Sequence, residues 1–150
     1  MQVTIEDATT KHLDRLYDIE KKCFKSEAFT KQQIANLLAD YNSISLIAKA
    51  NGEIVGFVIG VLYKQNGKTV GHILTVDVLP EHRRKGIGSR LLNEIEAIFR
   101  GKGASICVLE VREDNVAAFR LYQKLNYRKV ATLKHYYGSA HGIFLRKDLT

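Results

Sequence analysis

The first part of the chain alternates between strand-like and helix-like spacing of its apolar residues. Alternating apolar positions near Val3–Ala8 predict a first strand. From about Thr10 to Cys23 the apolar residues recur at helical spacing, which predicts a helix. Thr30 followed by Gln33 forms a capping box, so a second helix is expected to begin there.

Two Asn-Gly turns separate the strand-like segments that follow. Asn51-Gly52 lies between the apolar runs Ile44–Ala50 and Ile54–Tyr63, and Asn-Gly is a strong hairpin signal. Asn66-Gly67 marks a second hairpin, which leads into Val70–Leu79. The middle of the chain is therefore expected to form an antiparallel meander.

Helical and strand-like segments alternate after Pro80, the one proline of the chain. Apolar residues at helical spacing predict a helix over Ile87–Arg100, which Gly101 and Gly103 would end. The remaining segments are expected to be a strand, a helix and two further strands, over Ser105–Val111, Asn115–Leu125, Tyr127–Lys134 and Gly142–Leu149.

The resulting order of elements, βααβββαβαββ, predicts a mixed α/β (α+β) fold in a single domain that spans residues 1–150. We expect a mainly antiparallel central sheet of about seven strands, flanked by four helices on its two faces. No internal repeat, low-complexity tract or linker interrupts the sequence.

Composition and charge narrow the class of protein. Of the 150 residues, 45% are hydrophobic and 26% are charged, which is ordinary for a globular domain with its own core. No apolar run is long enough for a membrane span and the start does not resemble a signal peptide, so we expect a cytoplasmic protein. The net charge of +7 indicates an anionic partner, which could be a nucleic acid, a membrane surface or a phosphorylated cofactor.

The cysteines give no sign of metal or disulfide chemistry. Cys23 and Cys107 lie in apolar segments and are expected to be small buried side chains in a reducing compartment. The sequence has neither a Cys-x-x-Cys pair nor clustered ligands, so no metal site is expected.

The segment around Pro80 has the pattern of an anion-binding turn. A strand stops there, and a basic stretch with two glycines opens directly into the helix expected from Ile87. Backbone N–H groups at a helix N-terminus attract phosphate, and Gly86 and Gly88 would let a pyrophosphate approach the backbone closely. The spacing is not that of a Walker A loop or of a Gly-x-Gly-x-x-Gly fingerprint. A glycine-rich helix start beside a solvated basic run is the alternative that spacing alone leaves open.

The run Arg83-x-x-Gly86-x-Gly88 resembles the Arg/Gln-x-x-Gly-x-Gly/Ala motif of the GNAT superfamily of N-acetyltransferases. In element order the resemblance extends from Val3 to Leu149, and it implies the GNAT fold with acetyl-CoA as cofactor. It also implies that the turn binds the pyrophosphate and that the preceding strand pairs with the pantetheine arm. The implied cofactor-binding residues are Val76, Val78, Arg83, Arg84, Lys85, Gly86, Ile87, Gly88, Ser89, Asn115 and Tyr122.

A second block, Leu109–Tyr127, resembles the RimI-like ribosomal-protein-alanine N-terminal acetyltransferases. In that subgroup the Leu-Glu-Val-Arg strand carries the general base, which implies this role for Glu110; a strand-end salt bridge is the alternative. The resemblance implies that Tyr122 protonates the leaving thiolate, although its place on an apolar helix face also suits a core residue. Asn115 is expected to cap that helix as well as contact pantetheine. His72 is the competing base, because an imidazole pKa near 6.5 suits proton transfer at neutral pH.

Two connections are expected to bind the acceptor. The first runs from Phe24 to Phe29 and the second from Lys134 to Gly142, where paired tyrosines resemble the peptide groove of N-terminal acetyltransferases. RimI-like proteins usually carry an acidic pair before the last strand, whereas this chain has His141-Gly142, so the peptide specificity stays open. The expected acceptor-binding residues are Phe24, Glu27, Phe29, Tyr136 and Tyr137.

These observations favour an N-acetyltransferase that modifies the N-terminal α-amine of a protein, such as a ribosomal protein. Direct attack would use Glu110 as a base through water and Tyr122 as the acid. An α-amine has a reference pKa of about 7.7–8.0, so a modest base is sufficient. A monomer or a homodimer without membrane contact is expected.

Two other functions stay open. One is acetylation of a small amine, such as a polyamine, an aminoglycoside or an amino-acid derivative, although the acceptor connections supply only Glu27 as an acid. The other is a non-catalytic module that binds acyl-CoA or nucleic acid. The basic residues are not interleaved with aromatic ones, so direct nucleic-acid binding is not expected.

Overall fold

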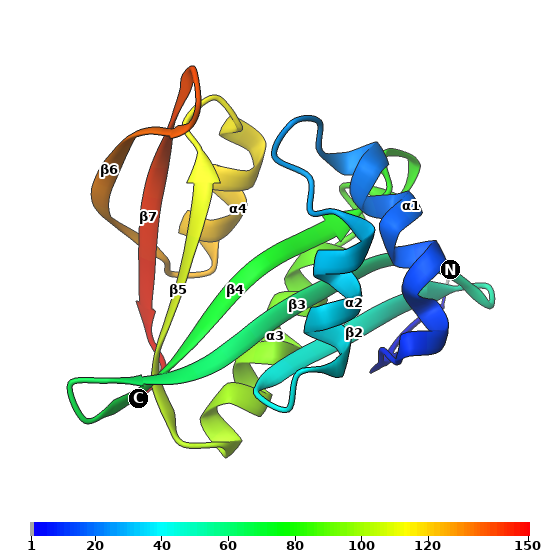
Figure 1. Cartoon of the computed structure of the whole chain (residues 1–150), viewed down its shortest axis with the longest axis horizontal. Coiled ribbons are helices and arrows are strands. Elements are labelled where there is room, and N and C mark those ends of the chain that lie inside the picture. Colours follow the sequence, from blue (N-terminus) through cyan, green and yellow to red (C-terminus); the bar gives the residue numbers. More distant parts are fainter. Residues whose placement is uncertain (1) are drawn as a thin grey trace.

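A single seven-stranded sheet forms the centre of the computed structural model, which describes residues 2–150 (Figure 1). The strands lie in the order β1-β2-β3-β4-β5-β7-β6, and all neighbours are antiparallel except β4 and β5. The strands are β1 Val3–Asp7, β2 Ser43–Ala50, β3 Glu53–Gln65, β4 Lys68–Val78, β5 Ala104–Arg112, β6 Arg128–Tyr137 and β7 Ala140–Asp148. The helices are α1 Leu13–Cys23, α2 Lys31–Ala39, α3 Ile87–Gly101 and α4 Val116–Lys124, with short 3-10 turns at Thr10–His12 and Pro80–His82. The predicted α+β fold is confirmed.

Helices pack on both faces of this sheet. In Figure 1 α1 and α2 lie in front of β2, β3 and β4, and α3 lies behind them. Phe99 of α3 is fully buried, and a Cβ atom added at Gly60 or Gly71 would overlap its ring. These two glycines therefore let α3 approach the strands closely, because a larger residue would push the helix away.

The parallel pair β4 and β5 separates halfway along its length. The two strands pair only from Thr69 with Ala104 to His72 with Val108. Beyond that point β4 continues to Val78 and β5 to Arg112 without pairing to each other, and Figure 1 shows them diverging. This divergence opens the sheet between its two halves and leaves one edge of β4 without a strand partner.

Local turn chemistry explains where several elements begin and end. Asn51-Gly52 and Asn66-Gly67 all have positive φ angles, as a tight hairpin turn of this kind requires. Thr30 caps α2, since its side chain accepts the N–H of Gln33 and the Gln33 side chain accepts the N–H of Thr30. The hairpins and the capping box that the sequence predicted are therefore confirmed.

Two predicted boundaries were wrong. The first helix does not run continuously from Thr10, because a 3-10 turn with its own capping box precedes α1. The predicted loop from Lys134 to Gly142 is largely strand, since β6 extends to Tyr137 and β7 starts at Ala140. The alternation of apolar and polar residues typical of a strand is interrupted there, because the register of β6 with β7 is irregular between Leu133 and Tyr137. His135, within this irregular stretch, has a φ of 56°.

Candidate active site

Two adjoining cavities occupy the opening between β4 and β5. One, here called the turn cavity, has a volume of about 620 Å³ and reaches the N-terminus of α3. The other, here called the loop cavity, has a volume of about 640 Å³ and is bounded by the α1–α2 connection and the β6–β7 hairpin. The residues that line both cavities are Phe24, Val76, Asn115, Ala118 and Tyr122. A molecule in one cavity would therefore meet a molecule in the other beside Tyr122.

The turn cavity is built from backbone at the start of α3. Arg84 and Gly86 both have left-handed φ angles, 62° and 81°, so the turn curls around the helix N-terminus. Gly86 is the N-cap and has no side-chain cap, which leaves N–H groups of the first turn available to a ligand. Such a concave run of N–H groups, at the positive end of a 15-residue helix, fits a phosphate or pyrophosphate.

Most of the residues predicted to bind the cofactor do line this cavity. They are Val76, Val78, Arg83, Arg84, Gly86, Ile87, Gly88, Ser89, Asn115 and Tyr122, whereas Lys85 is exposed outside it. A Cβ atom added at Gly88 would lie 3.4 Å from Leu121, an ordinary contact. The structure therefore explains why a motif of this kind accepts either glycine or alanine at its last position.

The end of β4 is held from two sides. The Val78 carbonyl accepts hydrogen bonds from Arg83 Nε at 2.9 Å and from Cys23 Sγ at 3.4 Å. This carbonyl is thus already occupied, and Arg83 fixes the strand end to the turn. Burial raises the pKa of the Cys23 thiol to about 11, so the thiol is protonated at neutral pH, as a hydrogen-bond donor must be.

The two residues that the sequence offered as alternative bases form one pair. His72 and Val108 are register partners, so Glu110 lies on the same sheet face as His72. His72 Nε2 and Glu110 Oε1 are 2.8 Å apart, and their side chains are only 22% and 13% exposed. The ring of Tyr63 packs edge-on against His72 at 6.2 Å between ring centroids. Glu110 lines the loop cavity, and His72 supports it from the β4 side.

Tyr122 lies where the two cavities meet. Its side chain is buried and packs edge-to-face against Tyr127. Burial is the main reason that the pKa of Tyr122 is raised, and the nearby Asp77 and Tyr137 add to the effect. The phenol therefore keeps its proton at neutral pH and can act as a hydrogen-bond donor at this junction.

The expected acceptor residues also come together. Phe24, Glu27 and Phe29 line the loop cavity from the α1–α2 connection, and Tyr136 and Tyr137 line it from the β6–β7 hairpin. The two tyrosine rings stack edge-to-face at 4.9 Å.

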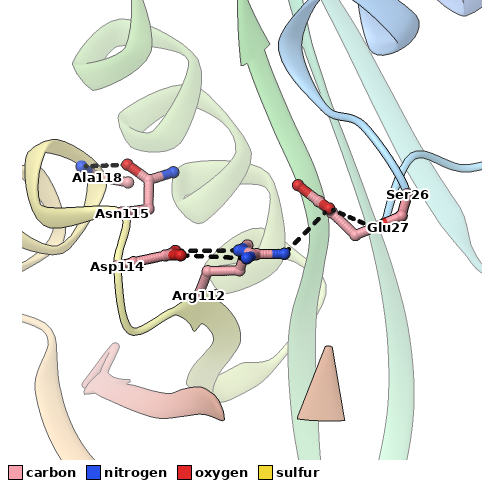
Figure 2. A network of polar contacts seen from close by, with 6 residues as sticks. All are labelled: Ser26, Glu27, Arg112, Asp114, Asn115 and Ala118. Atoms are coloured by element: carbon pink, nitrogen blue, oxygen red, sulfur yellow. Dashed lines mark hydrogen bonds and ion pairs between the residues drawn. The ribbon is translucent and has the colours of Figure 1, made fainter. Parts of the chain in front are cut away.

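Arg112 joins the connections around the loop cavity and was missed in the sequence. Figure 2 shows its guanidinium between two carboxylates, at 3.4 Å from Glu27 and as a bidentate pair with Asp114 at 3.0 and 3.1 Å. The same group lies 5.8 Å from the ring centroid of Tyr137. The sequence did contain a signal for Arg112, because it is a charged residue at the end of an apolar strand, two residues after the predicted base Glu110. Asn115 caps α4 as predicted, accepting the N–H of Ala118 at 3.2 Å.

Three buried polar residues on the floor of the site were also missed. Glu20 of α1 and Thr75 of β4 line the loop cavity, and Asp77 lies beneath them. The signal for Glu20 was its spacing, since it follows the apolar stripe of α1 four residues after Leu16. Within residues 2–150 no group of three or more potential metal ligands is found.

A helix start that suits a phosphate, a split parallel strand pair and a His–Glu pair at the cavity wall are together typical of N-acyltransferases that use a nucleotide-containing acyl donor. The chain belongs to the acetyltransferase (GNAT) family, whose profile matches residues 13–127. The predicted family, enzyme class and acetyl-CoA cofactor are thereby confirmed. No helix among residues 2–150 is long and apolar enough to span a membrane.

Individual relatives and solved structures agree with this family. The N-alpha-acetyltransferase of Sulfurisphaera tokodaii is 33% identical over 117 residues, which cover 72% of this chain and 70% of the relative. Ard1 from Thermoplasma volcanium superposes with a TM-score of 0.90 at 26% identity, over 100% of this chain and 99% of that one.

Two further structures share the fold at lower identity. The ribosomal-protein-S18-alanine N-acetyltransferase from Escherichia coli has a TM-score of 0.88 at 22% identity, over 99% of this chain and 95% of that one. The PaiA N-acetyltransferase from Thermoplasma acidophilum, solved with coenzyme A, has a TM-score of 0.83 at 22% identity and covers 99% of both chains.

Proposed function

We propose that this N-acetyltransferase modifies the N-terminal α-amine of a protein or peptide. The observation that carries the proposal is the pairing of His72 with Glu110 at the wall of a cavity that meets the turn cavity at Tyr122. The Sulfurisphaera relative is named an N-alpha-acetyltransferase, which supports the same acceptor. A ribosomal protein as the acceptor stays a prediction, and so does the state of a monomer or homodimer.

The base must remove a proton from an ammonium group whose reference pKa is only about one unit above pH 7. At pH 7 roughly one α-amine in ten is neutral, because its reference pKa is about 7.7–8.0. Glu110, directly or through a water molecule, would accept the proton, and His72 at 2.8 Å would share the resulting charge. A lysine side chain, with a reference pKa of about 10.4, would need far more help.

Tyr122 would act on the donor side of the junction. A buried phenol with a raised pKa is a weaker acid than a thiol, whose reference pKa is about 8.5. We therefore assign Tyr122 a narrower role than full proton transfer, namely a hydrogen bond to the sulfur as it gains negative charge. The bound cofactor supplies the thioester, and backbone N–H groups at the start of α3 would hold its phosphates.

A second candidate function is favoured by the charge of the loop cavity. Three glutamates, Glu20, Glu27 and Glu110, line it, whereas the sequence had suggested a single acid in the acceptor connections. A polyamine, which carries several ammonium groups, would also suit such a lining.

A thiol-release assay with acetyl-CoA separates these functions. The peptide panel varies the first two residues and includes versions with a blocked N-terminus and a free internal lysine; spermidine is tested in parallel. We expect turnover with free N-termini that disappears when the α-amine is blocked. Turnover that persists in blocked peptides, or that occurs with spermidine alone, would overturn the proposal.

A further inference from the structure

A hydrogen-bonded chain links the acceptor connection to strand β4 beneath the loop cavity. Glu20 Oε2 accepts the backbone N–H of Phe29 at 3.0 Å, and Glu20 Oε1 lies 3.0 Å from the Thr75 hydroxyl. The same hydroxyl lies 2.5 Å from Asp77 Oδ1. Glu20 and Asp77 are each 1% exposed and Thr75 is 7% exposed, so the chain is largely shielded from bulk solvent.

The chain needs one proton more than the Thr75 hydroxyl supplies, so either Glu20 or Asp77 must carry it. The Thr75 hydroxyl has one proton, and it lies between two carboxylate oxygens that would both need one. If Thr75 donates to Glu20, then Asp77 must carry the proton of its own contact with Thr75. The other oxygen, Asp77 Oδ2, is buried and accepts no hydrogen bond from residues 2–150, which a neutral carboxyl tolerates far better than a carboxylate.

The groups around Asp77 support its neutral state. Burial is the largest cause of its pKa being raised well above the usual range, and the facing Glu20 of α1 is the second. Arg83, from the turn before α3, opposes the shift but does not reverse it. Cys23 of α1 and Tyr122 of α4 are near Asp77 and bring no positive charge, since both are neutral at pH 7.

We propose that Glu20, Thr75 and a protonated Asp77 are positioning residues that hold the segment Phe24–Phe29 against β4 and so set the affinity for the acceptor. This segment lines the loop cavity, and its end at Phe29 is held by the hydrogen bond from the Phe29 N–H to the Glu20 carboxylate. Acceptor binding without this tie would have to order the segment at a cost in affinity. The proposal rests on the proposed function only in that the acceptor is taken to be a peptide.

The test compares variants of the chain in two measurements. Glu20→Leu removes the acceptor of the Phe29 N–H with little change in size, Glu20→Gln restores an oxygen there, and Thr75→Val breaks the link to β4. Amide hydrogen exchange at Phe29 reports the tie itself. Steady-state kinetics report KM for the best peptide and, by calorimetry, Kd for acetyl-CoA.

We expect Glu20→Leu to lose the protection of the Phe29 amide and to raise the peptide KM about tenfold or more. Acetyl-CoA Kd should change less than about twofold, because Glu20 and Thr75 do not line the turn cavity. Glu20→Gln should recover much of the peptide affinity, and Thr75→Val, which adds no charge and keeps the shape, should weaken it.

Glu96→Gln is the matched control for a general loss of stability. Glu96 is equally buried, at 1% exposed, but lies in α3 and accepts bonds from Tyr127 and Lys147 away from the loop cavity. It should lower the melting temperature without changing the peptide KM. Folded Glu20→Leu protein with an unchanged peptide KM and an unchanged Phe29 amide would overturn the positioning role. If no peptide is a substrate, the exchange measurement still decides whether the tie exists, and only the proposed function fails.

Discussion

Glu110→Gln removes the negative charge from the wall of the loop cavity while it keeps a side chain of nearly the same size beside His72. The wild-type pair is 2.8 Å apart and largely shielded from water. A hydrogen bond to a charged partner is worth about 1.5–3 kcal/mol. If that energy stabilises the proton taken from the acceptor, kcat should fall about 10- to 150-fold at pH 7.

The pH dependence of this loss makes the test sharper. About one α-amine in ten is neutral at pH 7, and about nine in ten are neutral at pH 9. The variant depends on amines that are already neutral, so its deficit relative to wild type should shrink about eightfold between these two pH values. Glu113→Gln, which removes the same charge from an exposed position nearby, should leave kcat unchanged at both.

The assay is steady-state thiol release at saturating acetyl-CoA, with Kd for acetyl-CoA measured separately and expected to stay unchanged. His72→Gln completes the comparison, since it leaves Glu110 in place without its partner. Wild-type turnover by Glu110→Gln at both pH values would refute the role of Glu110. Loss in His72→Gln alone would move the base to His72, and loss in neither would make solvent the base.

Three further predictions concern cofactor affinity and stability. Gly86→Ala places a side chain at a φ of 81°, which costs about 1 kcal/mol, so the affinity for acetyl-CoA measured by calorimetry should fall up to about fivefold. Gly88→Ala, which adds only an ordinary contact with Leu121, should leave that affinity unchanged within error. Lys147→Met removes the cation that lies 2.7 Å from the buried Glu96 carboxylate, and Arg100, at 3.9 Å, compensates only in part. The free energy of unfolding measured in urea should therefore fall by about 3 kcal/mol. Because the pKa of Asp77 is raised in the folded protein, ionisation of Asp77 costs wild type stability as pH rises above about 4, and Asp77→Asn lacks this cost. The stability of Asp77→Asn relative to wild type should therefore grow between pH 5 and pH 7, by at most about 1.4 kcal/mol per pH unit, and a constant difference would contradict the neutral Asp77.

The sequence could predict the turn cavity because its chemistry is local. The strand end, the basic turn and the helix start lie within Val76–Ser89, and each has a sequence pattern of its own. Hairpin turns and helix caps were predictable for the same reason, since they depend on two to four neighbouring residues.

The acceptor side could not be predicted in the same way, because its contacts join distant parts of the chain. His72 and Glu110 are 38 residues apart, Glu20 and Thr75 are 55 apart, and Glu27 and Arg112 are 85 apart. No spacing rule connects such residues, and the two candidate bases were treated as alternatives although they are partners. The separation of β4 from β5 was equally hidden, because each strand continues beyond their last paired residues without a break in its sequence.

The linings of the two cavities differ in charge, which suits a donor and an acceptor of opposite sign. Two arginines and a lysine line the turn cavity, which suits the phosphates of the donor. Three glutamates and one arginine line the loop cavity, so its lining is negative although the whole chain has a net charge of +7. We therefore expect an ammonium group to be drawn to the loop cavity and not to the turn cavity. Acetylation converts that group into a neutral amide, so the product loses the attraction that brought the acceptor in, and the same charges that favour binding of the amine favour release of its acetylated form.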